Sequence, residues 1–114
     1  MKLVRATDLK NAHDVPAHYD MKSLDIHGME PEGYHNILIL GLSQFLPGGG
    51  AEKSEIKADV IYYVLEGEMT VINAQGETVI GAGDSVRFEK NEVREIVNRG
   101  AMVAKMLVIA GIPK

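Results

Sequence analysis

Short apolar runs separated by glycine-containing turns dominate the chain. Residues 60–65 are rich in β-branched and aromatic side chains, which suit a pleated, half-buried strand. Gly67 follows at a turn position where a positive φ is tolerated, and residues 69–72 form a second strand-like run. Two such runs around a glycine turn indicate a hairpin. We therefore predict a β-hairpin over residues 60–73, at the centre of the fold.

The same alternation of strand and turn continues on both sides of this segment. A strand is predicted over residues 35–46, and its residues 37–42 lack alternation, which is typical of a strand covered on both faces. Pro47 and the glycines after it are expected to end this strand. Further short strands are predicted at residues 77–80, 85–88, 93–97 and 102–110. No segment predicts a helix, so the pattern indicates an all-β fold, a small antiparallel barrel or sandwich.

The size and composition favour one intracellular domain. At 114 residues a single core is feasible, and we expect one domain over 1–114, with an N-terminal arm or edge strands over 1–30 and a barrel over 36–110. The absence of cysteine fits a reducing cytoplasm. No apolar run approaches the ~20 residues that span a bilayer, and the net charge of −4 argues against a nucleic-acid surface. We expect a cytoplasmic protein that binds neither membranes nor nucleic acids.

Several turn motifs resemble those of a known family. Pro-Gly-Gly-Gly at 47–50, Val-Leu-Glu-Gly-Glu at 64–68 and Gly-Ala-Gly-Asp-Ser-Val-Arg-Phe at 81–88, with Asn98 closing the next strand, are similar to motifs of the cupin superfamily. The resemblance covers about residues 40–110. It implies a double-stranded β-helix, or jelly-roll, and barrels that pair through their sheets. We accordingly expect a homodimer, with residues 37–42 in its interface.

The chain departs from the metal-binding members of this family, which supply three histidines and one glutamate from two spaced motifs. Aligned on Gly67 and Gly83, the ligand positions hold Ser54 and Ile56 (or Lys53 and Glu55), Val60 and Arg94, and only these glycines and Asn98 match. Val60 has no donor atom, and the guanidinium of Arg94 has no lone pair to give. The resemblance therefore predicts no metal at the usual positions, and no cofactor is expected.

A divalent metal would need a different set of ligands. Glu52, Glu55 and Asp59 precede the central strand, and His27 or His35 could reach the same end of the barrel. An oxygen-rich site of that kind would favour a hard cation. This atypical site is the alternative to a metal-free pocket.

Strand alternation predicts which side chains face the barrel interior. Tyr62 shares one face with Val60 and Val64, and Arg94 shares one with Ile96. Under the resemblance, Tyr62 and Arg94 point into the pocket where a metal would otherwise lie. Two histidines of the N-terminal arm, His13 and His18, are predicted as surface residues.

A buried arginine needs a partner, and two partners are open for Arg94. Its fork suits a carboxylate or phosphate of a ligand, with Tyr62 donating a further hydrogen bond. Alternatively, Arg94 pairs internally with Glu52, Glu55 or Asp59. The predicted ligand-binding residues are Arg94, Tyr62, Glu52 and Glu55.

Three functions fit this pattern. The first is a binding module for a small, carboxylated metabolite. The second is an enzyme, either a metal-free isomerase or dehydratase that uses Glu52, Glu55 or a histidine as base, or an oxygenase with an atypical metal site. The third is a dimeric interaction module with a residual pocket. No catalytic residue can be assigned from the sequence.

Overall fold

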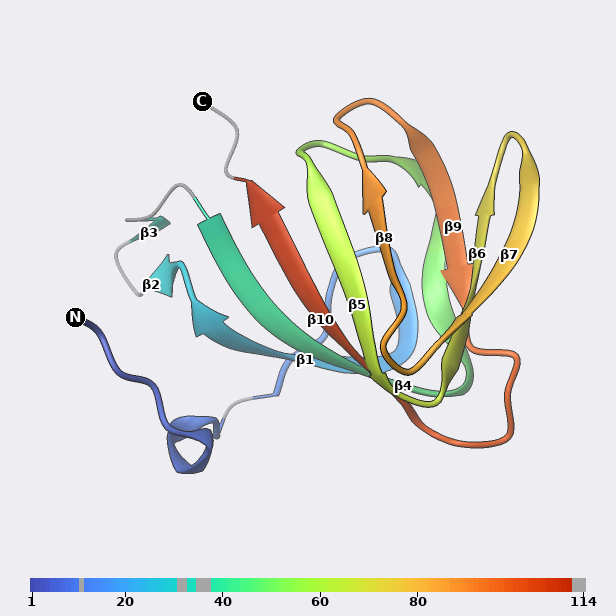
Figure 1. Cartoon of the computed structure of the whole chain (residues 1–114). Helices are drawn as coiled ribbons and strands as arrows, with labels where there is room; N and C mark the ends of the chain where they lie inside the picture. Colours follow the sequence, from blue (N-terminus) through green and yellow to red (C-terminus); the bar gives the residue numbers. More distant parts are fainter. Residues whose placement is uncertain (11, 31–32, 35–37, 112–114) are drawn as a thin grey trace.

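The computed structural model describes residues 1–10, 12–30, 33–34 and 38–111 (Figure 1). Its elements are a short 3-10 helix η1 (Ala6–Asp8) and the strands β1 (His18–His27), β2 (Met29–Glu30), β3 (Gly33–Tyr34), β4 (Leu38–Glu55), β5 (Val60–Glu66), β6 (Glu68–Asn73), β7 (Gly76–Gly81), β8 (Ser85–Phe88), β9 (Val93–Val97) and β10 (Ala104–Gly111). Across these ranges there is no helix long and apolar enough to cross a membrane.

One antiparallel sheet curls into a nearly closed barrel (Figure 1). Its strands follow the order β7-β6-β9-β4-β10-β5-β8, and β1 pairs along the other side of β4. The long strand β4 belongs to both layers, because residues 38–45 pair with β10 whereas residues 50–55 pair with β9. This arrangement confirms the predicted all-β antiparallel barrel of the jelly-roll type.

The predicted hairpin over residues 60–73 is wrong. β5 pairs with β10 and β8, whereas β6 pairs with β7 and β9, so the two strands lie in different layers. Gly67 carries the chain from one layer to the other with a φ of +76°. An added Cβ there would lie 2.8 Å from the Val103 carbonyl oxygen, which adds a steric reason for glycine. A glycine turn between two strands shows that the chain changes direction there. It does not show whether the two strands pair with each other or with other strands.

The glycines that follow Pro47 do not end the strand, contrary to expectation. β4 runs through them to Glu55. Side chains on Gly49 and Gly50 would collide with the carbonyl oxygens of Asp20 and Ile96. The glycines therefore let β1 and β9 approach β4 closely, which keeps the strand paired where it passes between layers.

The apolar strand predicted over residues 35–46 begins at Leu38 within the described chain, since residues 35–37 lie outside it. No described segment of the chain covers its outward face, where Leu38 is 55% exposed and Leu40 and Leu42 are half-buried. β1 covers the edge of β4 instead, with Leu24 opposite Leu42. The core thus covers one face, and the covering of the second face by a second subunit stays a prediction.

Alternation along the strands is as predicted. Val60, Tyr62 and Val64 are buried while the odd-numbered residues of β5 are exposed, and Arg94 and Ile96 are buried on β9. In the turn before β8, Asp84 Oδ2 accepts a hydrogen bond from the Gly81 amide at 2.9 Å. The largest fully buried side chains are Phe45, Phe88, Met69, Ile96, Met106, Val64 and Asn98.

Candidate functional site

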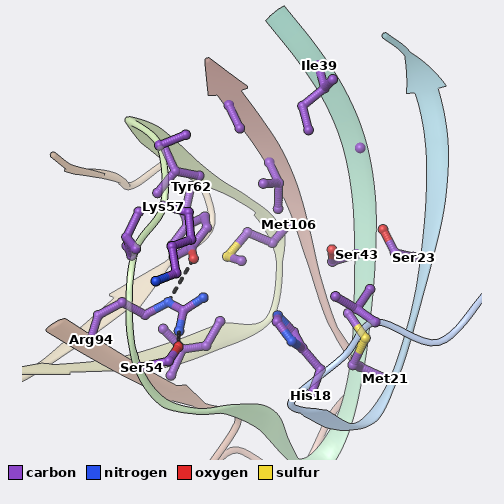
Figure 2. A pocket seen from close by; sticks show the side chains of 18 of the residues that line it. His18, Met21, Ser23, Ile39, Ser43, Ser54, Lys57, Tyr62, Arg94 and Met106 are labelled. Atoms are coloured by element: carbon purple, nitrogen blue, oxygen red, sulfur yellow. Dashed lines mark hydrogen bonds between the residues drawn. The ribbon is translucent and has the colours of Figure 1, made fainter. Parts of the chain in front are cut away.

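A cavity of about 420 Å³ lies inside the barrel (Figure 2). Its walls come from β1, β4, β5, β9 and β10 and from the segments that precede β1 and follow β4. Small-molecule sites typically enclose ~300–1,000 Å³ and are mostly apolar with a few placed polar groups. This cavity has that character, with apolar walls that include Met21, Phe45, Val60, Ile96 and Met106.

Arg94 is the buried charge of the cavity. It is 8% exposed and extends from β9 toward Tyr62 on β5. Its Nε donates to the Tyr62 hydroxyl at 2.9 Å, and its Nη1 donates to Ser54 Oγ at 3.0 Å and to the Glu52 carbonyl at 3.4 Å. Ser54 is the direct register partner of Arg94 on β4. The pairing of β4 with β9 therefore builds this cluster (Figure 2).

The guanidinium of Arg94 has no carboxylate partner among the described residues. Glu52 contacts it only through the backbone, and the side chains of Glu52, Glu55 and Asp59 are exposed. Glu55 borders the cavity, whereas Asp59 Oδ1 accepts a hydrogen bond from the Lys90 amide at 2.9 Å. The internal ion pair is therefore not formed, and the Nη2 group has no hydrogen-bond partner in the described part of the chain.

The residues at the usual metal positions do not fit a metal ion. Arg94 presents a cation and Val60 a hydrocarbon, and neither can coordinate. The atypical set is also dispersed: His27 does not border the cavity, Asp59 is held by a backbone amide, and His35 lies outside the described residues. Across the described ranges, no group of three or more histidine, aspartate or glutamate side chains could hold a metal.

The prediction that His18 is a surface residue is wrong. It opens β1, is half-buried, and its ring is directed into the cavity (Figure 2). Counting back in alternation from Met21 would place His18 on the outer face, but a bulge between Tyr19 and Met21 reverses the face. Asp20 at the bulge has a φ of +50°. No sequence signal marks this bulge, and the predicted surface position rested only on the place of His18 in the N-terminal arm.

The geometry fixes which nitrogen of His18 carries the proton. Nδ1 lies 2.8 Å from the Pro16 carbonyl oxygen, which can only accept, so Nδ1 is the N–H and Nε2 has the lone pair. Burial lowers the pKa of His18, and the charge of Arg94 lowers this pKa further, while the Pro16 hydrogen bond opposes both. His18 is therefore a neutral acceptor at about pH 7.

Two serines line the wall that faces Arg94 (Figure 2). Ser23 on β1 and Ser43 on β4 are register partners, and they are 8% and 5% exposed. Neither hydroxyl has a hydrogen-bond partner among the described residues. Lys57 borders the cavity on the side of Arg94, and its exposed side chain adds a second positive charge there.

His13 and Asp25 form an ion pair where the N-terminal segment crosses the cavity. His13 Nε2 lies 3.0 Å from Asp25 Oδ1, and Nδ1 lies 2.8 Å from the Asp14 carbonyl. The hydrogen bonds to Asp14 and to Asp25 raise the pKa of His13. The side chain of His13 is 43% exposed, in keeping with its predicted surface position, while its backbone pairs with Ser23 and the residue borders the cavity.

Comparison with known proteins gives a consistent family. The family model of the cupin domain matches residues 41–110. A protein of Mycobacterium tuberculosis named beta-D-galactosidase Rv1717 is 37% identical over 113 residues, which cover 99% of this chain and 96% of the relative.

Solved structures share the fold. The polyketide cyclase RemF from Streptomyces resistomycificus superposes with a TM-score of 0.82 at 23% identity, over 97% of this chain and 79% of the cyclase. A predicted oxalate decarboxylase from Thermotoga maritima gives a TM-score of 0.78 at 20% identity, over 98% and 100% of the two chains. At these identities the likeness concerns the fold alone, which accommodates several chemistries.

Proposed function

This chain belongs to the cupin domain family, and on that premise we propose that its barrel binds a small, carboxylated metabolite with Arg94 as the anchor. The cupin fold is common to cyclases and decarboxylases among the similar structures, so the fold does not choose the ligand. The choice rests on the chemistry of the cavity.

The observation that carries the proposal is a buried guanidinium without a carboxylate among the described residues. A charge removed from water is costly unless it is paired. The polar contacts of Arg94 are the neutral oxygens of Tyr62, Ser54 and Glu52, and they leave Nη2 without a described partner. A ligand carboxylate at Nη2 would supply the missing counter-ion in a charge-assisted hydrogen bond.

A thermal-shift screen of small carboxylic acids tests the proposal, because a ligand that binds only the folded state raises the melting temperature. We expect at least one acid to stabilise the wild-type protein, Arg94→Met to fold but lose this effect, and Arg94→Lys to keep part of it. Arg87→Met is the matched control, since Arg87 is exposed on β8 and pairs with Glu89. Equal stabilisation of Arg94→Met and wild type would contradict the proposal.

A second candidate function is glycoside hydrolysis, which the relative named beta-D-galactosidase favours. Glycosidases usually employ a pair of carboxyl groups. Asp25 and Glu55 are the carboxylate side chains that border the cavity in the described chain, and Asp25 is paired with His13. Release of nitrophenol from p-nitrophenyl β-D-galactoside by wild type, abolished in Glu55→Gln but not in Glu52→Gln, would establish this activity.

We also propose that the protein acts in the cytoplasm as a homodimer joined through the outer face of β1, β4, β10 and β5. The register places Leu24, Leu42, Leu107 and Tyr63 in one row across these strands. Leu40, Ile109 and Ile61 form the adjacent row. A face of this kind would be covered by the same face of a second copy around a two-fold axis.

A further inference from the structure

We infer that the ligand is a polyhydroxylated carboxylic acid, of the sugar-acid class, whose carboxylate meets Arg94 and whose hydroxyl groups meet Ser23, Ser43 and His18. This inference rests on the proposed function and adds to it the part of the ligand that lies away from Arg94. It follows from the unequal chemistry of the two sides of the cavity (Figure 2).

The serine wall is the first observation. Ser23 and Ser43 are register partners on the inner face of β1 and β4, more than nine-tenths buried, and both border the cavity. Both hydroxyl oxygens are open to the cavity rather than sealed from it, and a hydroxyl in such a position pairs with water or with a ligand. These two have no described partner within the chain. Ligand hydroxyls can both donate to and accept from serine, so they satisfy this wall.

The tautomer of His18 is the second, independent observation. With Nδ1–H donated to the Pro16 carbonyl, Nε2 is left as an acceptor that faces the cavity. A ligand group opposite Nε2 must therefore donate a proton into the hydrogen bond. An ionised carboxylate cannot do this, whereas a hydroxyl can. The ligand thus needs its acid group at Arg94 and a hydroxyl group at His18.

The apolar residues between these polar ends complete the argument. Met21, Phe45 and Met106 border the cavity and offer hydrocarbon and thioether surface. A sugar acid has C–H surfaces for such contacts as well as hydroxyls for the serines. A fatty acid of similar length would fill the same volume but would leave the serine hydroxyls and His18 Nε2 unpaired, and sites with buried polar groups reject such analogues strongly.

Calorimetric titration of the full chain tests this inference. The probes are D-galacturonate, D-glucuronate and D-gluconate, with hexanoate as the acid without hydroxyls and D-galactose as the sugar without a carboxylate. We expect the tightest sugar acid to bind at least about tenfold more tightly than hexanoate and D-galactose. Ser43→Ala and His18→Phe should each weaken sugar-acid binding about threefold to tenfold and leave hexanoate unchanged.

Ser85→Ala is the matched control, because Ser85 is exposed on β8 and does not border the cavity. Ser43→Ala removes a single oxygen and carries the test if His18→Phe does not fold. The inferred contacts of ligand hydroxyl groups are wrong if hexanoate binds as tightly as every sugar acid, or if Ser43→Ala binds the sugar acids like wild type. In either case the proposal that Arg94 binds a carboxylate stands. If no acid binds, or if Arg94→Met binds acids like wild type, the proposed function fails as well.

Discussion

Arg94 on β9 donates its Nε–H to the hydroxyl of Tyr62 on β5 at 2.9 Å, and so joins the two layers of the barrel inside the cavity. β9 and β5 are not neighbours in the sheet, because β4 and β10 lie between them. The hydrogen bond therefore spans the interior rather than following the sheet. It holds the guanidinium in place and leaves its Nη2 group available to a ligand.

The first prediction concerns this hydrogen bond. Tyr62→Phe keeps the ring, which packs against Phe88 at a centroid distance of 5.9 Å, but removes the acceptor for Arg94 Nε. We expect the free energy of unfolding to fall by about 1–3 kcal/mol, because a buried donor loses its partner. Urea unfolding measures this difference. Tyr63→Phe, on the exposed face of β5, is the control. If both variants lose the same free energy of unfolding, the hydrogen bond between Arg94 and Tyr62 does not stabilise the fold.

The second prediction concerns the two histidines of the N-terminal segment. Burial lowers the pKa of His18, and hydrogen bonds to Asp14 and Asp25 raise that of His13. We expect His13 to titrate above 6.5 and His18 below 6.5, as followed by NMR of the imidazole Cε1–H signals. Assignment comes from His13→Gln and His18→Phe. A pKa of His18 above that of His13 would contradict the burial of His18 and the hydrogen bonds of His13.

These pKa values also set the sign of the pH dependence of stability. His18 takes up its proton more readily in the unfolded chain, so it destabilises the fold as pH falls below 6.5. His13 has the opposite effect. Its protonated form stabilises the fold below pH 6.5, and this stabilisation is lost as the pH rises through the raised pKa of His13. Compared with wild type between about pH 5 and 8, His18→Phe should lose less stability on acidification, and His13→Gln should lose more.

The third prediction concerns the homodimer. Leu107 lies in the middle of the apolar row on the outer face, between Leu42 and Tyr63. Leu107→Asp should convert a dimer into a monomer, because a charge in a buried interface must lose its hydration. Light scattering gives the mass directly. Val79→Asp on β7, where Val79 is 60% exposed, should leave the dimer intact, and a monomeric wild-type protein would rule out this interface.

The fourth prediction concerns metal content. Because Arg94 and Val60 stand where metal ligands are usual, we expect plasma mass spectrometry of freshly purified protein to find no stoichiometric iron, manganese, nickel or zinc. Addition of a chelator should leave the melting temperature unchanged. A stoichiometric metal removed by the chelator, with loss of stability, would show that other side chains of the chain supply the ligands.

Local patterns in the chain were enough to predict the class of fold and the face on which many side chains lie. Strand alternation together with the family resemblance predicted Tyr62 and Arg94 inside the barrel, and both are buried. The side chain of the turn residue Asp84 accepts a hydrogen bond within its own turn. Such features are local, because the period of a strand fixes which face a residue occupies once the strand is recognised.

The folded structure was needed to learn which strands are neighbours and which groups share the cavity. β5 and β6 look like a hairpin in the sequence but belong to different layers, and β4 continues through its glycines because β1 and β9 approach it there. One bulge reverses the face of His18 and brings it into the cavity with Arg94, far away in the chain. Strand pairing and bulges depend on contacts between distant segments, and a local pattern does not contain them.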